Sequence, residues 1–76
     1  MKNNTFNNIN TTVNNTDVVI YTPAQVSKLL NFGLTKTYQL FNTDGFPAIK
    51  IGHDFRVEKS KFEKWLTDYS GKEFFI

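Results

Sequence analysis

The sequence predicts a mainly α-helical domain with a small β-hairpin, on three observations. Residues 22–42 contain two apolar repeats of helical period with a glycine between them. Two short segments follow in which apolar and basic residues alternate, and a glycine-containing loop separates them. A third helical repeat then spans residues 59–70. The predicted order is helix, turn, helix, two-stranded hairpin and C-terminal helix, which is the order of a winged helix-turn-helix.

The first helix is expected to begin at Pro23, with Thr22 as its N-cap. A threonine side chain accepts from an orphan N–H of the first turn, and proline suits the first helical position. Gln25 completes a capping box with Thr22. Asn31 and Gly33 are expected to end the helix, because both residues tolerate the left-handed conformation of a helix stop. The apolar stripe is predicted at Val26, Leu29 and Leu30, with Gln25, Ser27 and Lys28 facing water.

The second helix is expected after Gly33, and its outward face is polar and mildly basic. Two short helices joined by a glycine-containing turn suit a helix-turn-helix, whose second helix lies in the DNA major groove. An ordinary helical hairpin with a solvated polar face fits the same residues, so both interpretations stay open at this point. The side predicted to be buried holds Thr37, Leu40 and Phe41, and the exposed side holds Thr35, Lys36, Gln39 and Asn42.

A hairpin is expected between residues 46 and 57. The turn-forming residues 42–45 stop the second helix, and Pro47 marks a strand entrance or a sheet edge. A loop of about three residues, Gly52-His53-Asp54, joins the two strands. Because this hairpin follows a helix-turn-helix and presents basic residues outward, it is interpreted as a wing; a hairpin that merely completes the core is the alternative. Its inward face is predicted to hold Ile49, Ile51, Phe55 and Val57, with Lys50 and Arg56 on the other side.

The C-terminal helix has the clearest period in the chain. It is expected to begin either at Ser60, which forms a capping box pattern with Glu63, or one turn earlier with Glu58 as the cap. Gly71 is expected to end it. Trp65 is interpreted as a core residue, because it lies centrally on the apolar face. That face is predicted at Phe62, Trp65, Leu66 and Tyr69.

Three further segments complete the domain organisation. Residues 1–16 are rich in asparagine and threonine and are predicted to be a disordered arm. An arm that reaches along DNA is the alternative, although its one charged side chain, Lys2, offers little attraction to phosphate. The folded domain is expected over residues 17–70, in which residues 17–21 form either a short strand or a buried lead-in. Residues 71–76 are an apolar tail that either folds back on the core or meets a partner.

Composition narrows the function classes. Seventy-six residues allow one domain, and the absence of cysteine excludes disulfides and cysteine zinc sites. The chain has one histidine and seven scattered carboxylates, so we expect no enzymatic activity, no metal site and no cofactor. No apolar run suits a signal peptide or membrane span, so a soluble, cytoplasmic protein that does not enter a membrane is expected. The net charge of +2 is compatible with nucleic-acid binding but does not argue for it unaided.

The order and spacing of these motifs resemble the excisionase family of small winged helix-turn-helix proteins, which is related to the DNA-binding headpiece of MerR-like regulators. The resemblance covers about residues 20 to 67. It implies sequence-specific binding to double-stranded DNA, and an origin in a phage or other mobile genetic element. It also implies partnership with an integrase or recombinase in setting the direction of DNA recombination. The residues that carry it are Tyr21-Thr22-Pro23, Val26, Leu29-Leu30, Gly33 to Leu40, Pro47 to Gly52, Arg56-Val57 and Phe62 through Leu66.

The resemblance also implies which residues contact DNA. Gln39 can pair with adenine, and Lys36 can donate to guanine or to a phosphate. Thr22 and Gln25 can offer backbone N–H groups to a phosphate at the N-terminus of the first helix. The implied recognition-helix residues are Thr35, Lys36, Tyr38 and Gln39, with Tyr38 near a phosphate, and the implied wing residues are Lys50, His53 and Arg56.

Two positions depart from the family pattern. Leu34 stands where the family often has arginine, and His53-Asp54 stands where it often has two basic residues. An aspartate at the wing tip repels phosphate. A weaker minor-groove contact, or a wing turned toward protein instead of DNA, therefore stays open. Two alternatives to an excisionase are a transcriptional regulator with the same DNA-binding mode and a winged-helix protein-interaction module that does not bind DNA. Cooperative binding or self-association is expected in the DNA-binding case, because one small domain buries a small interface.

Overall fold

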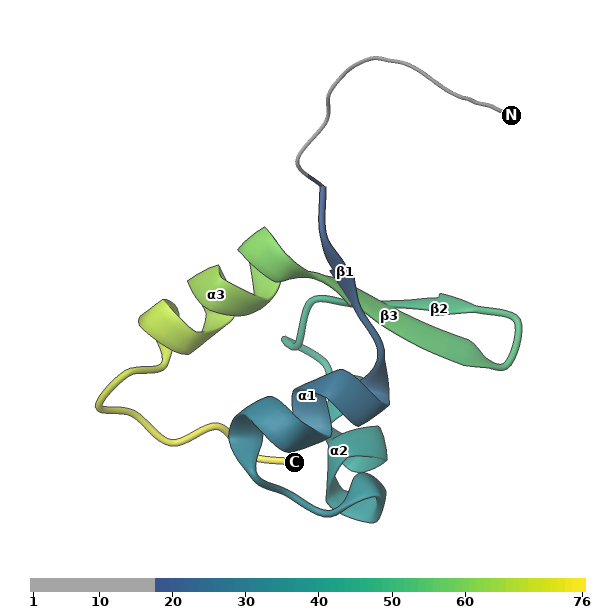
Figure 1. The fold of residues 1–76 in the computed structure, drawn as a ribbon. Helices are drawn as coiled ribbons and strands as arrows, with labels where there is room; N and C mark the ends of the chain where they lie inside the picture. The colour runs from purple at the N-terminus through teal and green to yellow at the C-terminus, as the bar shows by residue number, and fades with distance from the viewer. Residues whose placement is uncertain (1–17) are drawn as a thin grey trace.

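The structure is a computed structural model, and it describes residues 18–76. Three helices and a small antiparallel sheet make up the fold (Figure 1). The predicted arm, residues 1–16, lies outside the described residues. The elements in chain order are β1 (Ile20–Tyr21), α1 (Pro23–Leu30), α2 (Leu34–Phe41), β2 (Ala48–Ile51), β3 (Asp54–Glu58) and α3 (Lys59–Asp68).

The sheet has three strands in the order β1-β3-β2, one strand more than the predicted two-stranded wing. The sequence left open whether residues 17–21 form a strand or a lead-in. Ile20 and Tyr21 pair with Glu58 and Val57, so this segment adds a short strand to the side of β3 away from β2. The pairing ties the entrance of α1 to the end of the wing.

The caps of α1 form as the sequence predicts. The N–H of Gln25 donates to Thr22 Oγ1 at 3.2 Å, and the N–H of Thr22 donates to Gln25 Oε1 at 2.8 Å, which completes the capping box. Asn31 ends the helix with a left-handed φ of 58°. Two predictions here are wrong. Gly33 does not end α1 in a left-handed conformation; it has φ −69° and is the N-cap of α2. Leu29 does not face the core but is 57% exposed, and of the predicted stripe only Val26 and Leu30 reach the core.

The core lies where α1, α2, β3 and α3 meet. One polar side chain, Thr37, is fully buried among the described residues, and its Oγ1 donates to the carbonyl of Gly33 at 2.9 Å. This bond satisfies a hydroxyl that would otherwise be costly to bury. Aromatic rings in edge and tilted contacts fill most of the remaining space. The buried apolar side chains are Val26, Leu40, Phe41, Phe46, Phe55, Val57 and Phe62.

The helix α3 begins at Lys59 with Glu58 as its N-cap, which matches the earlier of the two predicted starts. The capping box predicted at Ser60 does not form, because Ser60 lies inside the helix. The predicted apolar face is wrong at one position: Leu66 is exposed, whereas Phe62 is buried and Trp65 packs partly buried against the core.

The C-terminal tail turns back from α3 toward α1 and α2 (Figure 1). The ring of Phe74 lies edge-on to Trp65 and Tyr69, with centroid separations of 5.1 and 4.8 Å. Phe75 remains 75% exposed. The tail therefore contributes one of its large apolar side chains to the core cluster and presents another to solvent.

Candidate nucleic-acid interface

The exposed face of α2 is centred on Thr35 and Gln39. These residues lie four positions apart, so they are neighbours on one side of the helix. The opposite side holds the buried Thr37, Leu40 and Phe41, as the sequence predicts. The predicted recognition surface is thus backed by side chains that are packed in the core.

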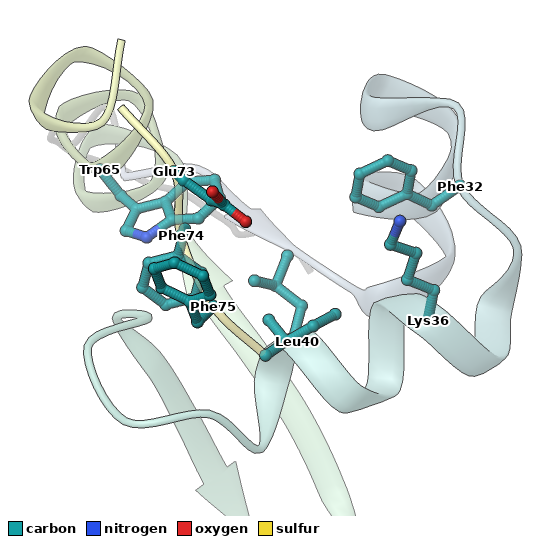
Figure 2. A pocket seen from close by; sticks show the side chains of 8 residues that line it. Phe32, Lys36, Leu40, Trp65, Glu73, Phe74 and Phe75 are labelled. Atoms are coloured by element: carbon teal, nitrogen blue, oxygen red, sulfur yellow. The ribbon is translucent and has the colours of Figure 1, made fainter. Parts of the chain in front are cut away.

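Lys36 lies on one flank of this face, toward the tail. Its Nζ sits 4.5 Å from the centroid of the Phe32 ring, in a cation–π contact (Figure 2). The same side chain lines a pocket of about 380 Å³ together with Leu40, Trp65, and the tail residues 73–76. Lys36 therefore lies next to Gln39 on the helix surface, and its ammonium is directed toward the tail.

Tyr38 lies on the other flank, toward the wing. Its ring contacts Phe55 of β3 with centroids 6.3 Å apart. The Nζ of Lys50, on β2, lies 5.6 Å from the centroid of the same Phe55 ring. Tyr38 and Lys50 thus come from different elements and meet at one buried aromatic side chain, which makes the surface of α2 continuous with the wing.

The register of the wing corrects the predicted inward face. Ile51 pairs with Asp54, and Lys50 pairs with Phe55. Residues directly opposite each other in an antiparallel pair share a face of the sheet. Lys50 therefore lies on the core side with Phe55, whereas Ile49 and Ile51 lie on the outer side, where they are 50% and 62% exposed.

The physical reason for the correction is the length of the loop. A three-residue loop, as predicted, would place Ile51 opposite Phe55 on the inner face. The observed loop has two residues, Gly52 and His53, and Gly52 has φ +62°. Because side chains alternate along a strand, a shift of one residue moves every side chain of β2 to the other face.

The predicted wing residues consequently separate. Lys50 faces the side of α2, and His53 lies exposed in the loop at the tip. Arg56 lies on the outer face opposite Ile49, and its guanidinium donates to the carbonyl of Phe55 at 2.7 Å. The prediction that Lys50 and Arg56 project to the same side is therefore wrong.

The residues predicted at the N-terminus of α1 bond each other. The backbone N–H groups of Thr22 and Gln25 are both occupied by the capping box. A phosphate at this position would have to replace one of these side-chain acceptors. The N-terminus of α2, by contrast, has Gly33 as its N-cap and no side-chain hydrogen bond to its first turn. Contact of Thr22 and Gln25 with DNA stays a prediction.

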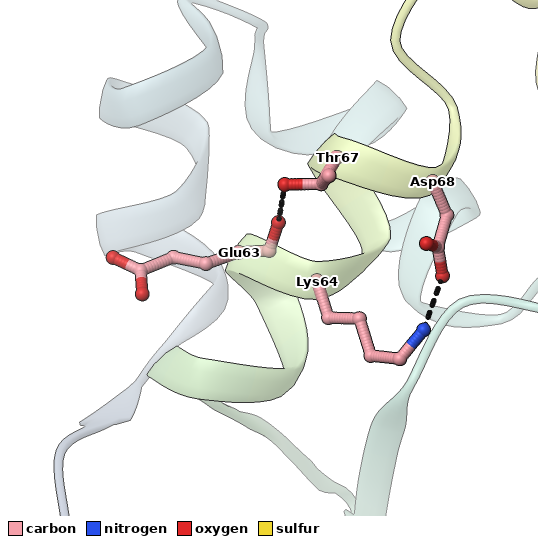
Figure 3. Close-up of polar contacts among 4 residues, drawn as sticks. All are labelled: Glu63, Lys64, Thr67 and Asp68. Carbon is pink, nitrogen blue, oxygen red and sulfur yellow. Dashed lines mark hydrogen bonds and ion pairs between the residues drawn. The ribbon is translucent and has the colours of Figure 1, made fainter.

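The net positive charge of the described residues lies in the half of the chain that contains α1 and α2. Residues 18–43 contain Lys28 and Lys36 and no acidic side chain, whereas residues 44–76 contain six basic and six acidic side chains. On α3, Lys64 bonds Asp68 at 2.8 Å (Figure 3). Lys59 lies 3.9 Å from Glu63 on the same helix. Because these two lysines are paired with acidic side chains, they add little to the field around α2.

Leu34, which stands where the resembled family often has arginine, is a surface residue. It is the first residue of α2 and is 50% exposed. The signal that places it is helical period: Leu34 lies four residues before Tyr38 and so shares its flank of the helix.

Within residues 18–76, no group of three or more histidine or acidic side chains could hold a metal ion, and no helix is long and apolar enough to cross a membrane.

A protein-family model described as a helix-turn-helix domain matches residues 20–70. The matched range begins at β1 and extends just past the end of α3, so it includes every element of the fold. Neither a search of curated proteins nor a search of solved structures gives a match.

Proposed function

The chain belongs to the helix-turn-helix domain family, and we propose that it binds double-stranded DNA with α2 in the major groove and the wing on the adjacent backbone or groove. The observation that carries the proposal is the continuous surface from Thr35 and Gln39, through Tyr38, to Lys50 on the wing. This surface presents hydrogen-bonding groups in its centre and an ammonium group at each side.

Each residue then has a distinct role in the proposed complex. Thr35 and Gln39 face base edges, where an amide side chain can bond adenine with two hydrogen bonds. Lys36 and Lys50 flank them and contact phosphates, which fixes the register of the helix without reading sequence. Tyr38 lies on the flank of α2 that faces the wing, and its hydroxyl is proposed to contact the DNA backbone.

Affinity from one copy is expected to be modest. Each phosphate neutralised steepens the salt dependence of log K by about 0.9, and only a few basic side chains lie on the proposed surface. A single module of this size also buries a small area on DNA. Specific binding in the cell is therefore proposed to need repeated sites, or cooperative contact between copies.

We propose a role in recombination as the biological context: a small excisionase-like protein of a phage or mobile element, acting beside an integrase. The resemblance of residues 20 to 67 to excisionases supports this context. A transcriptional regulator would use the same DNA-binding mode. The two roles differ in what happens once DNA is bound.

Gel retardation over a salt series tests DNA binding. The probe is a duplex library with randomised base pairs, titrated between about 50 and 200 mM salt. Wild type should retard and enrich a subset of sequences, with affinity that falls as salt rises. The Thr35→Ala, Gln39→Ala double variant should still retard DNA but enrich nothing. A control double variant at the C-terminal end of α3 and in the turn after it, Thr67→Ala with Ser70→Ala, should behave as wild type. No retardation by wild type at low salt would refute the proposal.

An excision assay separates recombination from transcription control. A reporter flanked by the attachment sites of the element is excised by its integrase with and without this protein. An excisionase raises excision, and the double variant at Thr35 and Gln39 does not. A regulator instead changes transcription from a promoter that carries the enriched sequence, and leaves excision unaltered.

One observation favours a second candidate, a protein-interaction module. The outer face of the sheet carries Ile20, Ile49 and Ile51, all exposed, with Arg56 among them. A pull-down with the integrase tests this face. If Ile49→Ser with Ile51→Ser abolishes capture while DNA retardation is unchanged, the face is a protein contact. If wild type captures integrase and never retards DNA, the interaction module replaces DNA binding.

A further inference from the structure

The exposed face of α2 offers methyl and amide groups but almost no charge. The whole helix reads Leu-Thr-Lys-Thr-Tyr-Gln-Leu-Phe, and Lys36 is its one ionised side chain. Guanine is read mainly by arginine or lysine, which donate to its O6 and N7. A helix face without such donors at its centre has to read other base edges.

Lys36 is directed away from that centre. Its ammonium lies over Phe32, on the flank that faces the tail, and the side chain lines the pocket beside Leu40 (Figure 2). The cation–π contact favours this orientation of the charge by about 0.5–1 kcal/mol. A phosphate on the flanking strand is therefore a better partner for Lys36 than a guanine in the groove.

Leu34 is a half-exposed apolar residue that does not belong to the core cluster. It is 50% exposed, and the side chains packed against the core do not include it. As the first residue of α2 it belongs to the N-terminal part of the helix, which is the part that contacts base edges in helix-turn-helix proteins. The apolar group that a major groove presents is the C5-methyl of thymine.

We propose that α2 reads A·T base pairs, with Leu34 packing against a thymine C5-methyl group and Gln39 bonding the N6 and N7 of an adenine. The inference rests on the proposed DNA binding and names the class of sequence that it selects. Lys36 contributes affinity through phosphate and no base preference.

Replacement of thymine by uracil tests the contact directly, because it removes the methyl group and keeps the Watson–Crick pair. Wild type first selects a sequence from a randomised duplex library, and that duplex is then made with deoxyuridine at each thymine in turn. Loss of the contacted methyl should weaken binding about fourfold, the equivalent of about 0.8 kcal/mol for one methyl-sized group. Leu34→Ala should bind the thymine and uracil duplexes equally.

Two more variants sharpen the assignment. Leu66→Ala removes an exposed leucine from α3 and should keep the wild-type ratio between thymine and uracil duplexes. Leu34→Arg supplies a guanine-reading side chain and should enrich guanine at the position where wild type enriches thymine. Because Leu34 is half exposed, Leu34→Ala and Leu34→Arg should both leave the fold intact, and circular dichroism checks this.

The possible failures are distinguishable. If wild type enriches a G·C-containing sequence, or binds thymine and uracil duplexes equally, the A·T inference is wrong while the proposed DNA binding stands. If Leu34→Ala remains as sensitive to uracil as wild type, Leu34 is not the residue that contacts the methyl group. If wild type retards no duplex, the proposed function fails, and the inference fails with it.

Discussion

Tyr38 of α2 and Phe55 of β3 pack together with ring centroids 6.3 Å apart, and this contact joins the second helix to the wing. Phe55 is buried, so its position is set by the core. Tyr38 is exposed on its other side. A residue of the proposed DNA surface is thereby positioned by a core residue from a different element.

Tyr38→Ala should therefore weaken both folding and DNA binding. Loss of the aromatic pair is expected to lower the free energy of unfolding by about 1 kcal/mol, measured by urea denaturation. Tyr38→Phe keeps the ring and should stay within about 0.5 kcal/mol of wild type. If Tyr38→Phe nonetheless loses DNA affinity, the hydroxyl itself contacts the backbone. Equal stability of the alanine and phenylalanine variants would contradict the packing role.

Lys50→Ala and Arg56→Ala should differ in their effect on DNA binding, although both remove one positive charge from the wing. Lys50 lies on the face shared with Phe55, and Arg56 lies on the outer face. We expect Lys50→Ala to weaken binding to all sequences and to reduce the salt slope by about 1. Arg56→Ala should leave the slope unchanged. Identical slopes for the two variants in gel retardation would show that the wing approaches DNA in some other orientation.

Phe62→Ala should be far more damaging than Phe75→Ala. Phe62 is 2% exposed and contacts Tyr21, Phe46 and Trp65, whereas Phe75 is exposed. Truncation of a buried phenylalanine costs about 3–5 kcal/mol, which is a large part of the stability of a domain this small. The exposed substitution should change the free energy of unfolding by less than about 0.5 kcal/mol. Thermal denaturation followed by circular dichroism measures both.

Gly45→Ala should destabilise the domain through two separable effects. Gly45 has φ +95°, which strains any side chain, and an added Cβ would lie 3.3 Å from Cε1 of Phe74. Gly52→Ala is the matched control, because Gly52 has φ +62° with open space around it and should cost only the backbone term of about 1–2 kcal/mol.

A double-mutant cycle isolates the steric part at Gly45. In a Phe74→Ala background the alanine at this position no longer meets the ring, so Gly45→Ala should cost less there than in wild type. Strictly additive costs in urea denaturation would mean that the tail does not pack on the 42–45 turn in solution.

The elements of this protein follow from local sequence. Apolar residues at helical spacing, the Thr22–Gln25 capping box, Asn31 at the end of α1 and the turn before Pro47 are signals contained within a few residues, and the structure confirms them. The division of α2 into a buried and an exposed side was also predictable, because helical period alone determines it. Hydrogen bonds and periodicity within one element require no knowledge of its neighbours.

Tertiary structure alone decided the faces of the wing, the flanks of α2 and the course of the tail. The apolar–basic alternation of β2 predicted Ile49 and Ile51 on the inner face, but a loop of two residues instead of three placed Lys50 with Phe55 and turned both isoleucines outward. The direction of the Lys36 ammonium depends on Phe32, and the course of the tail depends on Phe74 meeting Trp65. Each of these results from contacts between elements, whose geometry no single segment of the sequence contains.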